Sequence, residues 1–202
     1  MKRININTQQ THFIGCWNLK NDKLCNDITK FFENNKNLQK QGVFGGGKAN
    51  LKVKSTIDIA INPNDLKNPK YKIFKQYIGE LHKCFLEYKN QWPFLKTMIK
   101  NIDIPSFNIQ KYSKGDHFAH MHSERTSLNT LHRLFAWMTY LNNVDGGGQT
   151  NFSHYGIKIK PEIGKTLIWP AEWTHAHSGE ILKSGTKYII TGWMHFPHKE
   201  LE

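Results

Sequence analysis

The spacing of apolar residues changes character about halfway along the chain. Before residue 105, the longer patterns repeat every three or four positions, as on the buried face of a helix. Residues 71–88 show this most clearly, with Phe74, Ile78, Leu81 and Phe85 on one face. The elements expected in this half are three helical segments, 24–38, 71–88 and 92–99, and one alternating strand, 52–61.

Short strand-like runs follow one another in the second half, with glycines between them. Gly115, Gly146-Gly147-Gly148, Gly164 and Gly185 mark the expected turns. Many short strands separated by such turns are typical of a sandwich or barrel. A double-sheet jelly roll is the all-β form that can house metal ligands in its mouth. The expected strands are 107–112, 118–123, 134–141, 149–152, 157–160, 166–169 and 188–196.

Together these patterns predict an α+β protein with a double-stranded β-helix (jelly-roll) core and N-terminal supporting helices. A length of 202 residues suits a single domain, and 38% apolar with 12% aromatic residues is enough for a core. Residues 1–105 are expected to form the helical support with some strand. Residues 106–198 are expected to form the jelly-roll core.

Composition indicates a compartment with reducing conditions. No apolar run approaches the roughly 18 residues of a membrane span, and the polar start lacks the apolar stretch of a signal peptide. Cys16, Cys25 and Cys84 follow no disulfide or metal spacing. We therefore expect reduced thiols, a cytoplasmic protein and no membrane partner.

The net charge of +12 raises the question of an acidic partner such as nucleic acid. However, lysine and arginine are spread along the whole chain, and no arginine cluster or basic-aromatic stripe stands out. Lysine and asparagine are abundant throughout, which favours a bias of composition. Nucleic acid is therefore an open but not a favoured partner.

Two histidines and a glutamate form the strongest candidate for chemistry. His122 and Glu124 are two positions apart, so on a strand they share one face. His177 follows more than fifty residues later, as expected for a ligand from another strand. Two imidazoles and one carboxylate leave three positions of an octahedral metal open, as in non-haem Fe(II) oxygenases. In a chain with 11 histidines, an isolated H-x-E could equally be a solvated strand edge.

Three segments around these residues carry a family resemblance. They are YSKGDHFAHMHSE at 112–124, AWMTYLNNVDGGGQTNF at 136–152 and THAHSGEILKSGTKY at 174–188. In order and spacing they resemble the ligand segments of 2-oxoglutarate/Fe(II)-dependent dioxygenases of the prolyl 4-hydroxylase superfamily. The resemblance covers roughly residues 107–196. It is closest to hydroxylases of prolyl and lysyl residues and to phage relatives with H-x-E, which would place a viral protein in the host cytoplasm.

The resemblance implies a dioxygenase domain that uses Fe(II), 2-oxoglutarate and O2, with ascorbate as a candidate addition. Iron would be held by His122, Glu124 and His177. Oxidative decarboxylation of 2-oxoglutarate would drive hydroxylation of an unactivated C–H bond, with a prolyl residue of a peptide or protein as the leading substrate. Because C–H cleavage then needs no general base, no catalytic residue is expected beyond the metal ligands.

The resemblance also implies a co-substrate pocket. Lys187, ten residues after His177, should bind the distal carboxylate of 2-oxoglutarate, and Tyr140 and Tyr112 should donate hydrogen bonds to it. Thr191 is expected on the same strand face, followed by Trp193 as a pocket wall. For each aromatic residue the alternative is a place in the barrel core.

The chain departs from the family pattern at two positions, and two further histidines are alternative metal ligands. Glu124 stands where most members have aspartate, and Lys187 stands where many have arginine, which gives a point charge in place of a bidentate fork. His175 shares a face with His177 and could replace it. His120 could likewise pair with His122.

Four other functions compete with a peptidyl hydroxylase. The first is the same chemistry on nucleic acid, but the family's alkylation-repair branch carries a second arginine six residues after its co-substrate arginine, where this chain has Trp193. A zinc-dependent hydrolase could use two histidines and a glutamate but gives Lys187 and Tyr140 no role. The third is a non-catalytic binding module. The same chemistry on a small molecule also remains open. Loops 42–54, with Gly45-Gly46-Gly47, and 123–132 are expected to set specificity.

Overall fold

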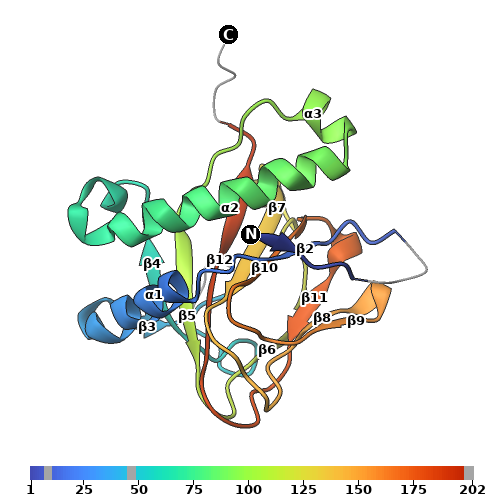
Figure 1. Ribbon diagram of the computed structural model, residues 1–202. Helices are drawn as coiled ribbons and strands as arrows, with labels where there is room; N and C mark the ends of the chain where they lie inside the picture. The colour runs from blue at the N-terminus through green and yellow to red at the C-terminus, as the bar shows by residue number, and fades with distance from the viewer. Residues whose placement is uncertain (7–10, 45–48, 198–202) are drawn as a thin grey trace.

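In the computed structural model, which describes residues 1–6, 11–44 and 49–197, two antiparallel sheets face each other and helices cover the outer side of the larger one (Figure 1). Among the described residues, eight strands form the large sheet in the order β1-β2-β10-β7-β12-β5-β4-β3. Four form the small sheet in the order β6-β11-β8-β9. This arrangement confirms the predicted α+β class with a jelly-roll core.

The strands have the following bounds. In the large sheet they are β1 Lys2–Arg3, β2 Gly15–Asn18, β10 Lys165–Pro170, β7 Arg133–Tyr140, β12 Lys187–His195, β5 Phe107–Tyr112, β4 Ile57–Ile61 and β3 Lys40–Gln41. In the small sheet they are β6 Phe118–His122, β11 His177–Gly179, β8 Thr150–Phe152 and β9 Ile157–Ile159.

The helices are α1 Asp22–Asn34, α2 Lys72–Gln91 and α3 Phe94–Met98. Single 3-10 turns lie at η1 Lys36–Leu38, η2 Asp65–Lys67, η3 Pro69–Tyr71, η4 Leu128–Thr130, η5 Ser153–Tyr155 and η6 Trp173–His175. Helix α2 crosses the outer face of the large sheet (Figure 1). None of the helices in the described ranges is both long and apolar enough to span a membrane.

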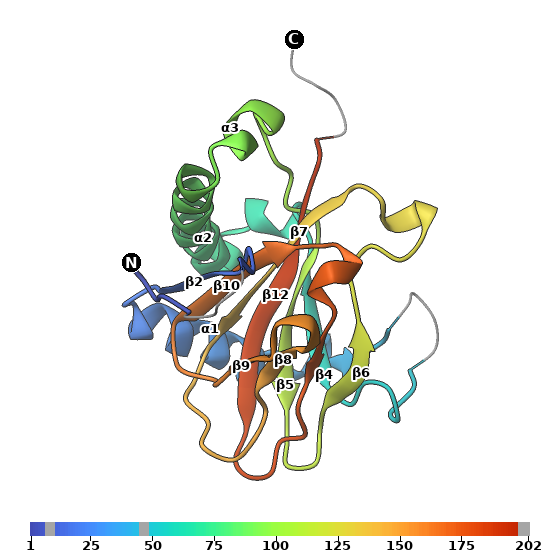
Figure 2. The same cartoon turned by 90° about the vertical axis from the view of Figure 1, so that its right-hand side faces the viewer.

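Two apolar layers lie on opposite faces of the large sheet, because successive strand residues point to opposite sides. Trp137 and Ile190 pack with the helices, whereas Met138 and Ile189 pack with the small sheet. Figure 2 shows β8 and β9 of the small sheet in front of the large sheet, with β6 to their right.

Several predicted elements differ from the structure. The helix expected at 24–38 ends at Asn34, because the Asn35 side chain donates to the carbonyl of Phe31 (2.7 Å) and closes the last turn. Of the strand expected at 52–61, only Ile57–Ile61 is extended, since 51–53 form a turn. Strands β1, β2 and β3 were not expected, and β2 adds N-terminal residues to the large sheet beside β10.

Candidate metal centre and co-substrate pocket

The register of the small sheet brings the two candidate histidine ligands together. His122 ends β6 and pairs directly with His177, which begins β11. Their ring centroids lie 4.4 Å apart. One ligand atom from each of His122, Glu124 and His177 lies within 4.8 Å of the others, so the structure gathers all three residues. The antiparallel pairing of β6 with β11 thus brings together two histidines that are more than fifty residues apart in the sequence.

Glu124 is not on the strand with His122, contrary to the expectation of a shared strand face. Strand β6 ends at His122, and Glu124 lies in the bend that follows. Its backbone is held from both sides: Arg133 Nη1 donates to its carbonyl oxygen (2.9 Å), and the next amide, of Arg125, donates to Ala171 O (3.0 Å). The carboxylate therefore reaches the histidines from a fixed turn.

Hydrogen bonds orient both imidazoles with Nε2 toward the cluster. His122 Nδ1 lies 2.9 Å from His120 O, and His177 Nδ1 lies 2.9 Å from His175 O. A carbonyl oxygen can only accept, so Nδ1 carries the proton and Nε2 of the neutral ring is free to bind a metal. The two Nε2 atoms lie 3.9 Å and 3.4 Å from Glu124 Oε1, respectively.

Electrostatics favour the protonation states that a metal requires. Burial, together with the charge of His177, lowers the pKa of His122 to about 4. Burial alone would raise the pKa of Glu124, but hydrogen bonds from His177 and Trp193 and the charges of the two histidines lower it to about 2. Near neutral pH the site thus offers a neutral imidazole at His122 and an ionised carboxylate.

The donor set fits a divalent iron. Two imidazole nitrogens and one carboxylate oxygen converge from one side of the space between the sheets. This is the ligand pattern of non-haem Fe(II) sites, in which three positions stay open.

A cavity of about 1100 Å³ opens beside the cluster. Its lining includes the three candidate ligands and four of the five predicted co-substrate residues: Lys187, Tyr112, Thr191 and Trp193. The fifth, Tyr140, does not line it. The cavity continues across β5 and β4 toward β3, through Asn108, Gln110, Asp58, Ala60 and Gln41.

Lys187 presents a desolvated cation to this cavity. It begins β12, pairs with Tyr112 and is 3% exposed. Its Nζ donates to Gly148 O (3.0 Å) and lies 4.0 Å from the centre of the Tyr112 ring. Burial lowers its pKa to about 7, against a small opposing effect of Glu180. Among the described residues no carboxylate forms an ion pair with it, so a bound anion would supply the missing partner.

The hydroxyl groups near Lys187 are arranged differently from the prediction. Tyr112 donates to Gln110 Oε1 (2.9 Å), and Tyr140 bonds to Thr150 Oγ1 (2.6 Å) and Ile159 O (3.2 Å). Both phenols are therefore already engaged. Thr150, which lines the cavity, stands between Tyr140 and the open space. Thr150 was not singled out from sequence, although it is the threonine of the G-G-x-T-x-F motif.

Thr191 and Trp193 follow Lys187 on the same face of β12. Thr191 Oγ1 donates to Trp137 O (2.8 Å), which leaves its lone pairs toward the cavity that it lines. Trp193 also lines the cavity, but its Nε1 donates to Glu124 Oε2 (2.6 Å). The tryptophan thus contacts a candidate metal ligand as well as forming a wall, a contact that the sequence did not indicate.

The two alternative histidines lie outside the group of three. His175 is buried, with Nε2 facing His12 O (2.9 Å) and Nδ1 facing Thr174 Oγ1 (3.0 Å). Its carbonyl oxygen, rather than its ring, serves the site by orienting His177. His120 is exposed and its ring packs against Phe44.

Aromatic rings enclose both candidate histidine ligands, a feature that the sequence analysis missed. Phe118 stacks on His122 with centroids 3.9 Å apart, and Phe44 meets the same ring edge-on. Trp169 and Phe152 pack against His177 at 5.0 Å and 5.6 Å. These contacts fix the ring planes and limit access of water.

Both loops expected to set specificity contribute to the cavity. From loop 123–132 the lining includes Ser123, Thr126, Ser127 and Asn129. From loop 42–54 it includes Val43, Phe44 and Lys54, whereas Gly45, Gly46 and Gly47 lie outside the described residues.

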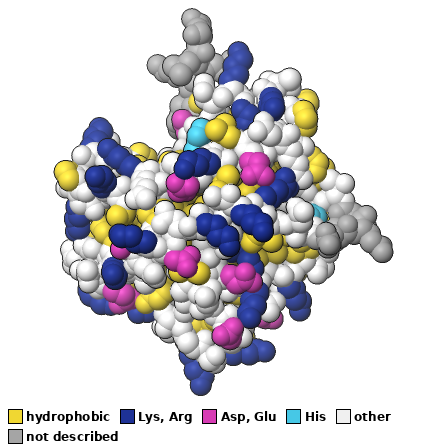
Figure 3. Space-filling view, viewed as in Figure 1, with side chains coloured by type: hydrophobic (Ala, Val, Ile, Leu, Met, Phe, Trp, Pro, Cys, Tyr) yellow, Lys and Arg dark blue, Asp and Glu magenta, His cyan; other side chains and the backbone are white. Residues whose placement is uncertain are grey.

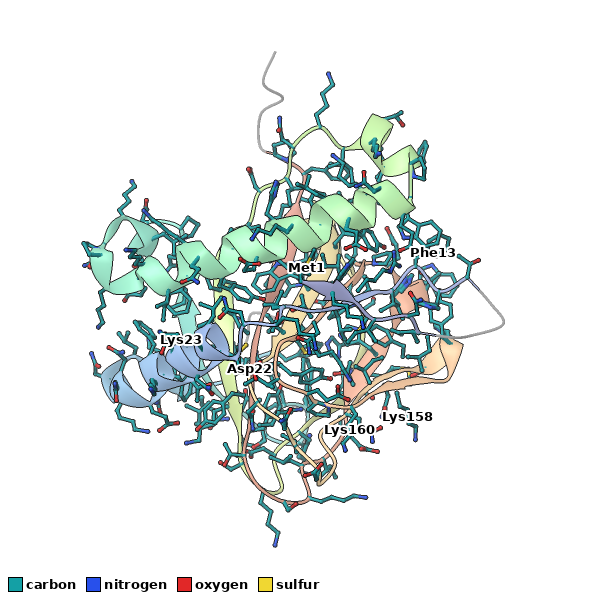
Figure 4. The ribbon with its side chains drawn as sticks, in the orientation of Figure 1. Met1, Phe13, Asp22, Lys23, Lys158 and Lys160 are labelled. Carbon is teal, nitrogen blue, oxygen red and sulfur yellow. The ribbon has the colours of Figure 1, made fainter. Side chains whose placement is uncertain are left out.

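Surface charge is dispersed. Basic side chains are scattered over the face shown in Figure 3, with acidic groups among them. The exposed Lys23, on α1, and Lys158, on β9, lie on separate parts of this face (Figure 4). The dispersion on this face agrees with the expectation of a compositional bias.

The chain is similar to known proteins, most clearly in its second half. Residues 107–195 match the family described as the 2OG-Fe(II) oxygenase superfamily. Prolyl 4-hydroxylase subunit alpha-1 of Homo sapiens is 24% identical over 98 residues, 45% of this chain and 17% of the relative. The Gallus gallus protein matches at 24% with 18% covered. The match therefore spans less than a fifth of these relatives.

Similar solved structures share the fold over nearly the whole chain. A Pseudomonas putida prolyl-4-hydroxylase has a TM-score of 0.70 at 16% identity and covers 93% of this chain and 94% of its own. The viral collagen prolyl hydroxylase of Paramecium Bursaria Chlorella virus-1, as a 2OG complex, has 0.66 at 17%, covering 95% and 99%. A Trichoplax adhaerens prolyl hydroxylase with a hypoxia inducible factor peptide fragment has 0.71 at 15%, covering 92% and 84%.

Proposed function

We propose that the chain is an Fe(II)- and 2-oxoglutarate-dependent dioxygenase that hydroxylates a prolyl residue of a peptide or protein, because residues 107–195 match the 2OG-Fe(II) oxygenase superfamily. The observation that carries the proposal is one cavity lined by both the three-donor cluster and the buried cation of Lys187. A zinc hydrolase would leave this cation without a role.

His122, Glu124 and His177 would hold the iron, each through one atom. When bound, iron together with 2-oxoglutarate and O2 supplies the oxidising power to break an unactivated C–H bond. The chain's own contribution is placement: Nδ1 of each histidine is bound to a carbonyl, Nε2 faces inward and Glu124 is ionised. Phe118, Trp169 and their neighbours exclude water around the ligands.

Lys187 would bind the distal carboxylate of 2-oxoglutarate. The hydroxyl of Thr150 lines the same cavity and can donate to the same anion, whereas Thr191 Oγ1 donates to Trp137 O. One cation with neutral donors matches a single carboxylate group, since an anion inserted here pairs with a charge that is otherwise desolvated. The face of the Tyr112 ring contacts the ammonium group in a cation–π interaction.

The remainder of the cavity suits a polypeptide. Its walls carry many amide and hydroxyl side chains, including Asn108, Gln110 and Asn129, which can pair with backbone amides. Lys54, a cation of this wall, is already bound to Asp58 (2.7 Å). The similar Trichoplax adhaerens protein is a prolyl hydroxylase with a bound peptide fragment, which favours a peptide substrate.

The first test is anaerobic addition of Fe(II) and 2-oxoglutarate to metal-free protein. A broad visible charge-transfer band is expected. It should be absent in His122→Ala and need far more 2-oxoglutarate in Lys187→Ala, while Lys187→Arg should retain it better. The matched control is Lys165→Ala, which removes a buried lysine of β10 that pairs with Glu162.

No band in the wild-type protein would refute the oxygenase, with Zn2+ binding in place of iron pointing to a hydrolase and no metal binding to a non-catalytic module. If the band forms, proline-rich peptides are tested for gain of one oxygen atom by mass spectrometry, with succinate release measured in parallel. Release of succinate without peptide hydroxylation, but with oxidation of another substrate class, would refute the prolyl substrate and keep the chemistry.

A further inference from the structure

The two carboxylate oxygens of Glu124 have different partners. Oε1 faces the imidazoles, 3.4 Å from His177 Nε2 and 3.9 Å from His122 Nε2. Oε2 accepts a hydrogen bond from Trp193 Nε1 at 2.6 Å. The side chain of Glu124 is only 12% exposed, so water contributes little to holding it. Oε1 is thus the inner oxygen, which faces the imidazoles, and Oε2 is the outer oxygen, which faces Trp193.

Arg133 braces both members of this contact. Its guanidinium lies 3.8 Å from the centre of the Trp193 ring, and its Nη1 donates to the backbone oxygen of Glu124 (2.9 Å). The same Nη1 is 3.9 Å from Oε2. Arg133 begins β7 and Trp193 lies on β12, two strands paired side by side, whereas Glu124 lies in a bend. Two residues of the sheet, Arg133 and Trp193, therefore hold the side chain of Glu124, which comes from a bend.

A glutamate needs this support more than an aspartate does. Its extra methylene adds one rotatable bond, and fixing that bond costs conformational entropy on metal binding unless it is already fixed. A free glutamate could also offer both oxygens to a metal. We infer that Trp193 and Arg133 are positioning residues that hold Glu124 by its outer oxygen, so that only Oε1 is presented to the metal.

This inference rests on the proposed function, since it assumes that the cluster binds a divalent metal. If it holds, the indole N–H rather than the bulk of Trp193 matters. Loss of that N–H would free Oε2, loosen the ligand and allow it to occupy a second position that the co-substrate needs. Partners of metal ligands of this kind change metal affinity by about 10–100-fold when removed.

The test is a Mn(II) titration of the metal-free protein, followed by the electron paramagnetic resonance signal of free Mn(II). Trp193→Phe keeps an aromatic ring against Arg133 but lacks the N–H, and should weaken Mn(II) binding by about 10-fold or more. Trp137→Phe is the matched control: its ring is fully buried, and its Nε1 has no hydrogen-bond partner among the described residues. It should leave Mn(II) affinity unchanged.

A double-mutant cycle separates positioning from packing. In Glu124→Asp the carboxylate is one methylene shorter and cannot span the cluster and Trp193 together, so Trp193→Phe should then cost little. Arg133→Leu, which removes the brace and spares the indole, should weaken binding in the protein that retains Glu124. Circular dichroism and thermal unfolding of each variant check that it is folded.

Each outcome has a distinct meaning. Equal losses from Trp193→Phe in the wild-type protein and in the Glu124→Asp variant would overturn the inference, because the ring would then act by packing alone. Unchanged affinity in Trp193→Phe would also overturn it. In both cases the metal site stands. Failure of the wild-type protein to bind Mn(II) would refute the proposed function and the inference together.

Discussion

The buried ammonium group of Lys187 makes the affinity for 2-oxoglutarate depend on pH in a way that can be worked out from the structure. Burial lowers the pKa of Lys187 to about 7, and the groups that face it are the Tyr112 ring and, at longer range, Glu180. A carboxylate bound to the ammonium group favours its charged form and raises that pKa again. Binding above pH 7 therefore takes up a proton.

The direction and size of the pH dependence follow from the linkage between proton binding and 2-oxoglutarate binding. Below about pH 7 the lysine is already charged, so affinity should be constant. As the pH rises through 7, affinity should fall, approaching about tenfold per pH unit while the bound form stays protonated. Replacing the ammonium group removes a charge-assisted contact of about 1.5–3 kcal/mol, so Lys187→Met should bind about 10–150-fold more weakly at low pH.

The assay is calorimetric or spectroscopic titration of the Fe(II) protein with 2-oxoglutarate, under anaerobic conditions, from about pH 6 to about pH 9. Lys187→Arg is the decisive variant, since a guanidinium stays charged throughout and should give a nearly flat profile. Lys187→Met should also be flat, at lower affinity. A wild-type profile without a fall above pH 7, or the same fall in Lys187→Arg, would refute the assignment of the co-substrate cation to Lys187.

Three further predictions test the site and the fold. His175→Ala should leave Mn(II) affinity unchanged in a titration, because the ring faces His12 O rather than the cluster; loss of binding would restore His175 as a ligand candidate. Thr150→Val should weaken 2-oxoglutarate binding more than Thr150→Ser, which keeps the hydroxyl next to Tyr140; equal effects would exclude a role for the hydroxyl. Asn21→Ala removes the N-cap of α1 and should lower the free energy of unfolding by about 1 kcal/mol in a denaturant titration, with no change in metal affinity.

Elements that depend on local geometry could be predicted from sequence. The strand at 107–112 has the expected bounds, and α2 exceeds the expected 71–88 by a few residues at its end. Here one face of the element is buried, so the apolar period reports the backbone conformation directly. Strand β2 has no such period, because Gly15, Cys16 and Trp17 are all buried on both faces of the sheet.

The candidate ligands could also be named from residue type and spacing, whereas their support could not. His122, Glu124, His177 and Lys187 carry the motif, and the structure gathers the first three beside the cavity that Lys187 lines. In contrast, Tyr140, which was predicted to bind the co-substrate, bonds to Thr150, and Thr150 rather than Tyr140 lines the cavity. A motif gives the identity of a side chain but not the direction in which its hydroxyl group points.

By itself, the sequence determined the chemistry that this chain can offer: two imidazoles, one carboxylate and one cation, on an α+β chain with short strands. Only the tertiary structure decided how these groups are held. The contact of Trp193 with Glu124 joins residues 69 positions apart, and the stack of Phe118 on His122 lies in a cavity that Val43 and Phe44 from the N-terminal half also line. Such contacts follow from strand register and sheet packing, which no local pattern of hydrophobic and polar residues encodes.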